Sequence, residues 1–211
     1  PPEHLSRGRA TFDRMRTQLM GGQFLDMLES VRDWEGTSTD ERLAAARKVI
    51  RFKSAKYTIE QPLLVGALAG GVDPAAVPGL SAYGLALGEA FQLRDDLLGV
   101  FGDPEQTGKP AGDDVREGKR TVLVAYTLDV ADRAQTTELA RWFGRPAVDA
   151  AGIDSVRQII RAVGAVDRVE SDISRLTHEA TQALGGSAAY LRPEASTVLS
   201  ELVQLATDRV T

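Results

Sequence analysis

Apolar side chains recur three and four residues apart along most of this 211-residue chain, which is the spacing of a helix that buries one face. The first long run, residues 6–32, carries an apolar stripe of Phe12, Met15, Leu19, Phe24, Met27, Leu28 and Val31. Runs that resemble strands are short and lie inside helical pattern, and only 6% of the residues are aromatic. Alanine and leucine, which favour helices, are abundant. The sequence therefore predicts an all-α fold.

Capping and breaking residues divide this pattern into successive helices. A second helix is expected to begin at Thr39 and to run towards Leu68, with Gly70 as its stop. Pro62 should kink or divide that helix, because proline lacks the N–H that a helix interior needs. Pro78 stands at the start of the next one. The further helices that the pattern predicts cover residues 79–101, 119–132, 134–143, 149–163, 165–185 and 187–208.

Length, charge and cysteine content limit the kinds of protein this chain can be. It is long enough for a continuous core, and we expect one domain over residues 1–211. A formal net charge of −5 argues against a nucleic-acid-binding protein, which would normally be basic. No apolar run approaches the roughly 20 residues that a membrane-spanning helix needs. The absence of cysteine excludes disulfides and cysteine-ligated metal sites, and it is consistent with a cytoplasmic location.

The helix expected over residues 79–101 carries the side chains with the clearest chemical meaning. Gln92, Asp95, Asp96 and Asp103 lie on one helical stripe, since side chains three or four residues apart share a face. Two adjacent carboxylates repel, and at an apolar surface both stay ionised only beside a cation. Mg²⁺ is the natural partner, because hard cations take carboxylate oxygens and bridge to phosphate. A solvated acidic patch is the simpler alternative, but the dipole disfavours acidic groups near a helix C-terminus.

Lysines accompany this acidic pair in the sequence. A loop rich in glycine and proline, residues 102–118, contains Lys109 and is followed directly by Lys119. Lys53 and Lys56 are expected on one face of an earlier helix. Taken alone, each lysine is more simply explained as a charged side chain on the surface than as a diphosphate-binding residue. Together with a metal-binding acid pair, however, ammonium groups on glycine-rich backbone suit a diphosphate held between Mg²⁺ and lysine.

A long, ordered set of residues resembles the trans-isoprenyl diphosphate synthases, also called polyprenyl synthetases, and most of all the bacterial geranylgeranyl and farnesyl diphosphate synthases. It runs from Phe91-Gln92-Leu93-Arg94-Asp95-Asp96-Leu97-Leu98 through Gly108-Lys109-Pro110 and Asp113 to Glu117-Gly118-Lys119-Arg120-Thr121. Upstream, Gly22-Gln23-Phe24-Leu25-Asp26 resembles the family's Gly-Gln-x-x-Asp motif. Lys56 is similar to the helix lysine that binds the allylic diphosphate, although Tyr57 intervenes before Thr58. The resemblance covers nearly all of the chain.

The resemblance implies a bundle of long antiparallel helices around a central cavity, assembled as a homodimer. It implies a Mg²⁺-dependent prenyltransferase that condenses isopentenyl diphosphate with an allylic diphosphate after ionisation of the latter. Geranylgeranyl diphosphate is the product that the resemblance favours, with farnesyl and geranyl diphosphates as alternatives. The implied partners are the two diphosphate substrates and a second copy of the chain, without nucleic acid or a membrane span.

Functional roles carry over only to the positions that match the family's motifs. Asp95 and Asp96 match Mg²⁺ ligands. The implied catalytic residues are Lys56, Gln92, Asp95 and Asp96. The implied substrate-binding residues are Gln23, Asp26, Lys56, Gln92, Lys109 and Lys119.

Two departures from the family's pattern bear on these roles. The family's second aspartate motif is Asp-Asp-x-x-Asp, and its fifth position here is Gly99, so Asp103 is the expected substitute as a metal ligand. The family's first aspartate motif is not in this sequence, which corresponds to the C-terminal two-thirds of such a domain. A non-catalytic subunit or truncated paralogue of the same fold is therefore the alternative. A helical terpene cyclase ranks below both, because it would not need this set of lysines.

Overall fold

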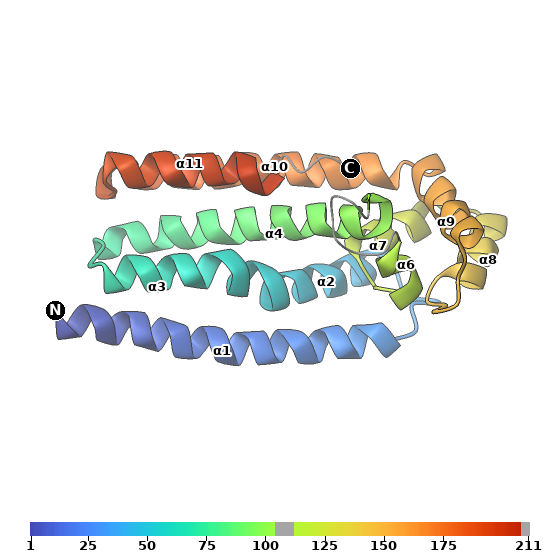
Figure 1. The fold of residues 1–211 in the computed structure, drawn as a ribbon, viewed down its shortest axis with the longest axis horizontal. Coiled ribbons are helices and arrows are strands. Elements are labelled where there is room, and N and C mark those ends of the chain that lie inside the picture. The colour runs from blue at the N-terminus through green and yellow to red at the C-terminus, as the bar shows by residue number, and fades with distance from the viewer. Residues whose placement is uncertain (104–111, 208–211) are drawn as a thin grey trace. The chain divides into compact units, whose positions relative to one another are not determined.

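The computed structural model describes residues 1–103 and 112–207, and this part of the chain is built from helices without any strand (Figure 1). The all-α prediction is therefore confirmed. The elements are α1 (Pro2–Val31), α2 (Thr39–Val49), η1 (Ile50–Glu60), α3 (Gln61–Ala69), η2 (Pro74–Ala76), α4 (Val77–Phe101), α6 (Asp113–Glu117), α7 (Val122–Val130), α8 (Arg133–Trp142), α9 (Ala150–Ala162), α10 (Ala165–Ser187), η3 (Ala188–Tyr190) and α11 (Pro193–Thr207). No helix in the described residues combines the length and apolar character needed to cross a bilayer.

The segment expected as one helix from Thr39 towards Leu68 contains a change of winding. It consists of α2, the π-helix η1 and α3, and Pro62 lies in the first turn of α3, the part of an α-helix where proline is most common. Within a π-helix each N–H bonds to the carbonyl five residues earlier, and at its end the Gln61 N–H donates to the Lys56 carbonyl. The expectation that Lys53 and Lys56 share a face assumed α-helical spacing, and that premise is wrong here.

The described chain divides into two compact units, each made from separated stretches of sequence. The first unit contains Pro1–Asp26, Lys48–Gln92 and the described part of the stretch that begins at Asp172. The second contains Met27–Arg47 and the described residues from Leu93 to Ser171. Helix α4 (green in Figure 1) contributes its first part to one unit and its last turns to the other.

In the first unit, glycines let helix backbones approach η1 closely. A Cβ atom at Gly84 of α4 would lie closer than 3.0 Å to the backbone of Glu60, and one at Gly88 would crowd Ala55 in the same way. Gly22 of α1 has the same relation to the backbone of Lys53. These contacts fix η1 between glycine-bearing faces of α4 and α1. Side chains carried by η1 are therefore held at defined positions.

In the second unit, the short helix α7 is buried on all sides and anchors the segment before it. Six consecutive side chains from Val122 to Thr127 are buried. Thr121 caps the helix, since its hydroxyl accepts a hydrogen bond from the Val124 N–H at 3.3 Å. Downstream, Asp132 and Gln135 form a reciprocal capping box at the start of α8. With these caps, α7 begins three residues later than expected and α8 begins one residue earlier.

Candidate active site

Helix α4 positions the two adjacent carboxylates that the sequence singled out. Asp95 and Asp96 lie within its last turns, so the predicted helical context is confirmed. Asp96 is buried, with 3% of its surface exposed, whereas Asp95 is half-buried. Asp103 follows the end of the helix at Phe101 and is exposed. A buried ionised carboxylate requires a cationic or hydrogen-bonding partner, and for Asp96 that partner is a lysine.

Lys119 reaches Asp96 because of the way α6 ends. Gly118 adopts a left-handed conformation with φ of 68°, which favours glycine. The Lys119 N–H bonds back to the Asp114 carbonyl at 3.1 Å and the Gly118 N–H to the Val115 carbonyl at 3.3 Å, which is a Schellman motif. The backbones of Asp114 and Lys119 are thereby tied together. With Thr121 capping α7, the connection from α6 to α7 is fixed at both ends.

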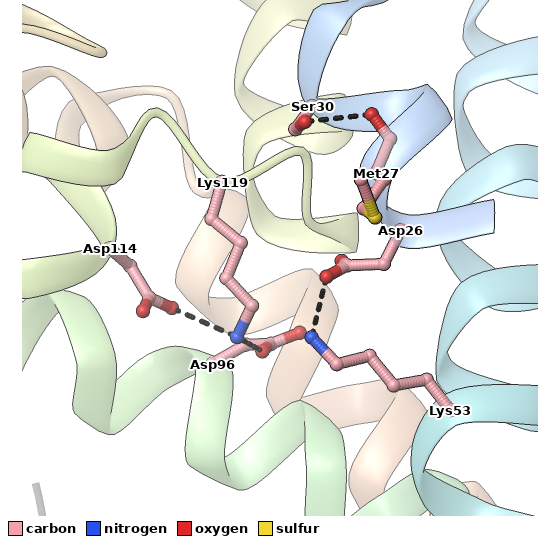
Figure 2. Close-up of polar contacts among 7 residues, drawn as sticks. All are labelled: Asp26, Met27, Ser30, Lys53, Asp96, Asp114 and Lys119. Atoms are coloured by element: carbon pink, nitrogen blue, oxygen red, sulfur yellow. Dashed lines mark hydrogen bonds and ion pairs between the residues drawn. The ribbon is translucent and has the colours of Figure 1, made fainter. Parts of the chain in front are cut away.

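The Lys119 ammonium bridges two buried carboxylates (Figure 2). Its Nζ lies 2.8 Å from Oδ1 of Asp96 and 3.4 Å from Oδ2 of Asp114. Burial alone would lower the pKa of Lys119, but the charges of Asp96 and Asp114 outweigh it and raise that pKa. Burial, together with the charges of Asp96 and Asp95, raises the pKa of Asp114 to about 6 against the opposing effect of Lys119. Lys119 is therefore a firmly protonated cation among three acids.

In the first unit, Lys53 of η1 pairs with Asp26 of α1 (Figure 2). The Lys53 Nζ lies 2.6 Å from Oδ2 of Asp26, and each side chain is 32% exposed. The pair follows from the motif that begins at Gly22, because the bare glycine lets the η1 backbone approach at Lys53 and Asp26 lies one helical turn further along. The resemblance singled out Asp26 and gave the diphosphate-binding role to Lys56, with no role for Lys53. The structure brings the two together.

Lys56, the lysine that the sequence favoured, faces a different partner. Its Nζ lies 3.0 Å from Oε2 of Glu60, which is buried and also accepts hydrogen bonds from Ser81 and Gln61. Burial alone would raise the pKa of Glu60, but the hydrogen bonds from Ser81, Gln61 and Lys56 lower it. Lys56 thus neutralises an internal carboxylate. That role by itself accounts for a lysine at this position.

Three further residues were predicted for the site. Gln23 is exposed on α1, and Gln92 is half-buried on α4. Lys109 lies outside the described residues. Asp114, Glu60 and the pairing of Lys53 were not anticipated. The sequence did contain a signal for Asp114. Gly118 ends a short helix, and a glycine in that position brings the backbone of Asp114 before it close to that of Lys119 after it.

The acidic side chains supply the type of oxygen donor that Mg²⁺ prefers. Among the described residues, no three histidine, cysteine, aspartate or glutamate side chains are grouped to hold a metal ion. The Lys119 ammonium lies between Asp96 and Asp114 and contacts both carboxylates. Carboxylate oxygens are the donors that Mg²⁺ prefers, and a cation already bridges two of them. Asp95, Asp96 and Asp114 therefore fit Mg²⁺ in donor type.

Known proteins match this chain over most of its length. The sequence model of the family described as Polyprenyl synthetase matches residues 6–162. A geranylfarnesyl diphosphate synthase of Aeropyrum pernix is 35% identical over 154 residues, which are 73% of this chain and 45% of that protein. A geranylgeranyl diphosphate synthase of Mycobacterium tuberculosis is 38% identical over 101 residues, 47% of this chain and 29% of that protein.

A solved structure resembles the whole of the chain. It is a geranylgeranyl pyrophosphate synthase from Corynebacterium glutamicum complexed with isoprenyl diphosphate and magnesium. Its sequence is 42% identical, the TM-score is 0.89, and the match covers 100% of this chain and 57% of that one. The chain therefore spans about half the length of the relatives it matches.

Proposed function

Because the chain belongs to the polyprenyl synthetase family, we propose that it forms part of a prenyltransferase that joins isopentenyl diphosphate to an allylic diphosphate. The observation that carries this proposal is the cluster of Asp96, Lys119 and Asp114, in which a protonated amine stands among carboxylates at the end of α4. Bound Mg²⁺ would supply neutralisation of the diphosphate leaving group. The corynebacterial relative was solved with isoprenyl diphosphate and magnesium, which supports the same ligands here.

We assign the following tasks to the chain's own residues. Asp95 and Asp96 would hold Mg²⁺. Lys119, and Lys109 of the Gly108-Lys109-Pro110 motif, would donate to diphosphate oxygens and stabilise the charge that develops as the allylic bond breaks. Gln92 and Gln23 orient substrate atoms. Geranylgeranyl diphosphate is the product we propose, because relatives named for its synthesis recur among the matches.

We further propose that Lys53, rather than Lys56, is the lysine of η1 that binds a diphosphate. Lys53 is next to Asp26, a residue of the Gly-Gln-x-x-Asp pattern, and it is followed by the hydroxyl residue Ser54, much as the family's lysine is commonly followed by threonine. Lys56 is engaged by buried Glu60. The Lys56 side chain is 14% exposed and that of Lys53 is 32% exposed, so Lys53 is the more accessible of the two to a substrate.

The test is condensation by the natural full-length protein with Mg²⁺, labelled isopentenyl diphosphate and a series of allylic diphosphates, followed by separation of the products by chain length. Wild type is expected to form labelled geranylgeranyl diphosphate. Lys53→Ala should weaken allylic substrate binding about ten- to a hundredfold, since a charge-assisted contact is worth roughly 1.5–3 kcal/mol. Titration of a non-reactive allylic thiodiphosphate measures that affinity directly.

Two lysine variants make this experiment discriminating. Lys48→Ala removes an exposed amine from α2 and should leave affinity unchanged. Lys56→Ala should lower thermal stability, because Glu60 loses its cation, while affecting affinity less than Lys53→Ala does. Equal affinities in all three variants would overturn the assignment of Lys53. A wild-type protein that forms no labelled product would overturn the proposed activity and favour a non-catalytic subunit.

We also propose that the protein is a homodimer, because α1 carries large apolar side chains that the rest of the described chain does not cover. The large apolar side chains exposed on this helix are Leu5, Phe12, Met20, Phe24, Met27, Leu28 and Val31. Light scattering on the full-length protein should give twice the monomer mass, and Met20→Glu, at a side chain that is 74% exposed, should shift it towards the monomer. A monomer at every concentration would contradict this proposal.

A further inference from the structure

The second unit contains a cavity that the proposed function does not use. Its volume is about 780 Å³, and it is lined by side chains from the loop after α1 and from α2, α7, α8 and α9. Pockets that bind small molecules typically measure about 300 to 1,000 Å³ and have mostly apolar walls. Part of this wall is formed by the buried apolar side chains of Val124, Leu139 and Ile160. Asp96 and Lys119 are not among the described residues that line it.

Arg120 brings a partly desolvated positive charge to this cavity. Its guanidinium carbon lies 5.6 Å from the centre of the Trp34 ring and 5.9 Å from that of the Phe143 ring, and both rings also line the cavity. Such contacts attract the charge but offer no acceptor oxygen to the N–H groups. The Arg120 Nε is buried, and within the described residues it has no hydrogen-bond partner. Burial lowers the pKa of Arg120 against the opposing charges of Asp33 and Glu29, so those acids compensate the charge only in part.

The residues around Arg120 are held in place by other contacts. Arg42 donates through Nε to the Thr37 hydroxyl at 3.0 Å and through Nη2 to the Trp34 carbonyl at 2.8 Å. The Trp34 indole N–H donates to Oε2 of Glu29 at 3.3 Å, and only 4% of the tryptophan is exposed. Arg120 itself belongs to the connection from α6 to α7, which is fixed at both ends. The charge and the ring of Trp34 are therefore preorganised, and a ligand would not have to order them.

The charges around the cavity favour a ligand with a single negative charge. Three arginines line it, Arg42, Arg120 and Arg133, together with two exposed acids, Asp33 and Glu35, so the positive charges exceed the negative ones by one. A carboxylate can accept two parallel N–H bonds from a guanidinium, which would supply the acceptor that the Arg120 Nε lacks. A diphosphate carries more negative charge than this excess balances, and the two acids would repel it.

We propose that this cavity is a second binding site, made by residues other than those assigned to prenyl transfer, for a small molecule with an apolar body and one carboxylate group. The apolar body lies against Val124, Leu139 and Ile160, and the carboxylate accepts hydrogen bonds from Arg120. The inference goes beyond the proposed function and does not depend on it, because binding here needs neither Mg²⁺ nor turnover.

The test is a fluorescence titration of anilinonaphthalene sulfonate into the natural full-length protein. Mg²⁺ and a saturating non-reactive allylic thiodiphosphate are present, so that the dye does not report on the proposed active site. The sulfonate of the dye stands for the carboxylate and its aromatic rings for the apolar body. Wild type should bind the dye, and decanoate should displace it. Arg120→Gln should weaken dye binding about ten- to a hundredfold, as loss of a hydrogen bond between charged groups does.

A neutral analogue and two further variants separate this site from general apolar binding. Phenylnaphthylamine has the same rings without the sulfonate, and its affinity should be unchanged in Arg120→Gln. Arg141→Gln is the matched control, because Arg141 also stacks on a tryptophan, 4.5 Å from the ring centre of Trp142, and is absent from the described residues that line the cavity. Ala140→Phe adds a ring to the lining from an exposed position on α8 and should weaken binding of both the dye and its neutral analogue.

Several results would overturn the inference. One is a wild type that does not bind the dye while the thiodiphosphate is present, and another is dye that decanoate does not displace. Wild-type dye affinity in Arg120→Gln would exclude a role for the guanidinium. If Arg120→Gln does not fold, Ala140→Phe decides, since unchanged dye affinity in that variant would place the dye outside the cavity.

Discussion

Replacing Asp96 with asparagine is expected to lower kcat for prenyl transfer about 10²–10³-fold, because one electrostatic contact to charge that develops in a transition state is commonly worth roughly 3–4 kcal/mol. Asparagine keeps the shape of the side chain but cannot neutralise a cation. Asp96 is buried and bonded to Lys119, so its negative charge acts where water does not screen it. Turnover at saturating substrate and Mg²⁺, measured beside thermal unfolding, separates loss of chemistry from loss of fold.

A variant at Asp95 tests the same catalytic role and is less prone to disturb the fold. Because Asp95 is only half-buried, Asp95→Ala should keep the helical circular-dichroism signal of wild type while turnover falls by orders of magnitude. Asp154→Asn is the control, since that side chain is 63% exposed and pairs with Arg157 within α9. Normal turnover in both the Asp96 and the Asp95 variants would show that these carboxylates do not hold the catalytic metal.

Most of the helices could be predicted because their ends are encoded locally. The reciprocal cap at Asp132, the left-handed Gly118 and the proline in the first turn of α3 each act within a few residues, so pattern and structure agree. The adjacent acids on α4 were recognisable for the same reason. Their helical spacing is a property of the sequence alone.

The π-helix η1 could not be predicted from the sequence, and it decides which acidic residues Lys53 and Lys56 contact. Wider winding carries Lys53 to Asp26 on another helix and leaves Lys56 beside Glu60. The close approach that accommodates η1 depends on Gly84 and Gly88 of α4, which are more than twenty residues away in sequence. Local pattern does not contain such a contact.

The role of Gly99 was hidden for a related reason. In the sequence, Gly99 only marks the position where the motif's third acid is absent. Asp103 is the next acid after it on the same helical face. The structure shows that Asp114, which the Schellman motif ties to Lys119, occupies the space beside it. A residue supplied from a separate helix becomes visible only when the two helices are packed.

Replacing Lys119 with methionine is expected to lower the free energy of unfolding by about 3–5 kcal/mol, because removing one partner of a buried ion pair leaves uncompensated buried charge. The Lys119 side chain is 28% exposed, and its two partners Asp96 and Asp114 are buried. Methionine keeps much of the apolar stem of lysine, so the loss reports mainly the ammonium group. Lys48→Met, at an exposed position on α2, is the control and should change stability by no more than about 0.5 kcal/mol.

The pH dependence of this loss identifies its cause. The pKa of Asp114 is already raised from 3.8 to about 6, and removing Lys119 removes the charge that lowers it, so it should rise further. A carboxyl whose pKa is higher in the folded than in the unfolded state binds its proton more tightly when folded. Stability is therefore lost as pH rises through the folded pKa. The deficit of Lys119→Met relative to wild type should be small near pH 5 and largest near pH 8.

Mg²⁺ gives the second signature, since a divalent ion can replace the missing ammonium between the two acids. Chemical denaturation at pH 8 should show that Mg²⁺ with inorganic pyrophosphate stabilises Lys119→Met more than it stabilises wild type, because ligands that bind only the folded state shift its stability by mass action. Catalysis should not recover with stability, since the amine that contacts the diphosphate is still absent. A deficit that neither pH nor Mg²⁺ changes would mean that Lys119 matters through packing, and that its charge does not organise Asp96 and Asp114.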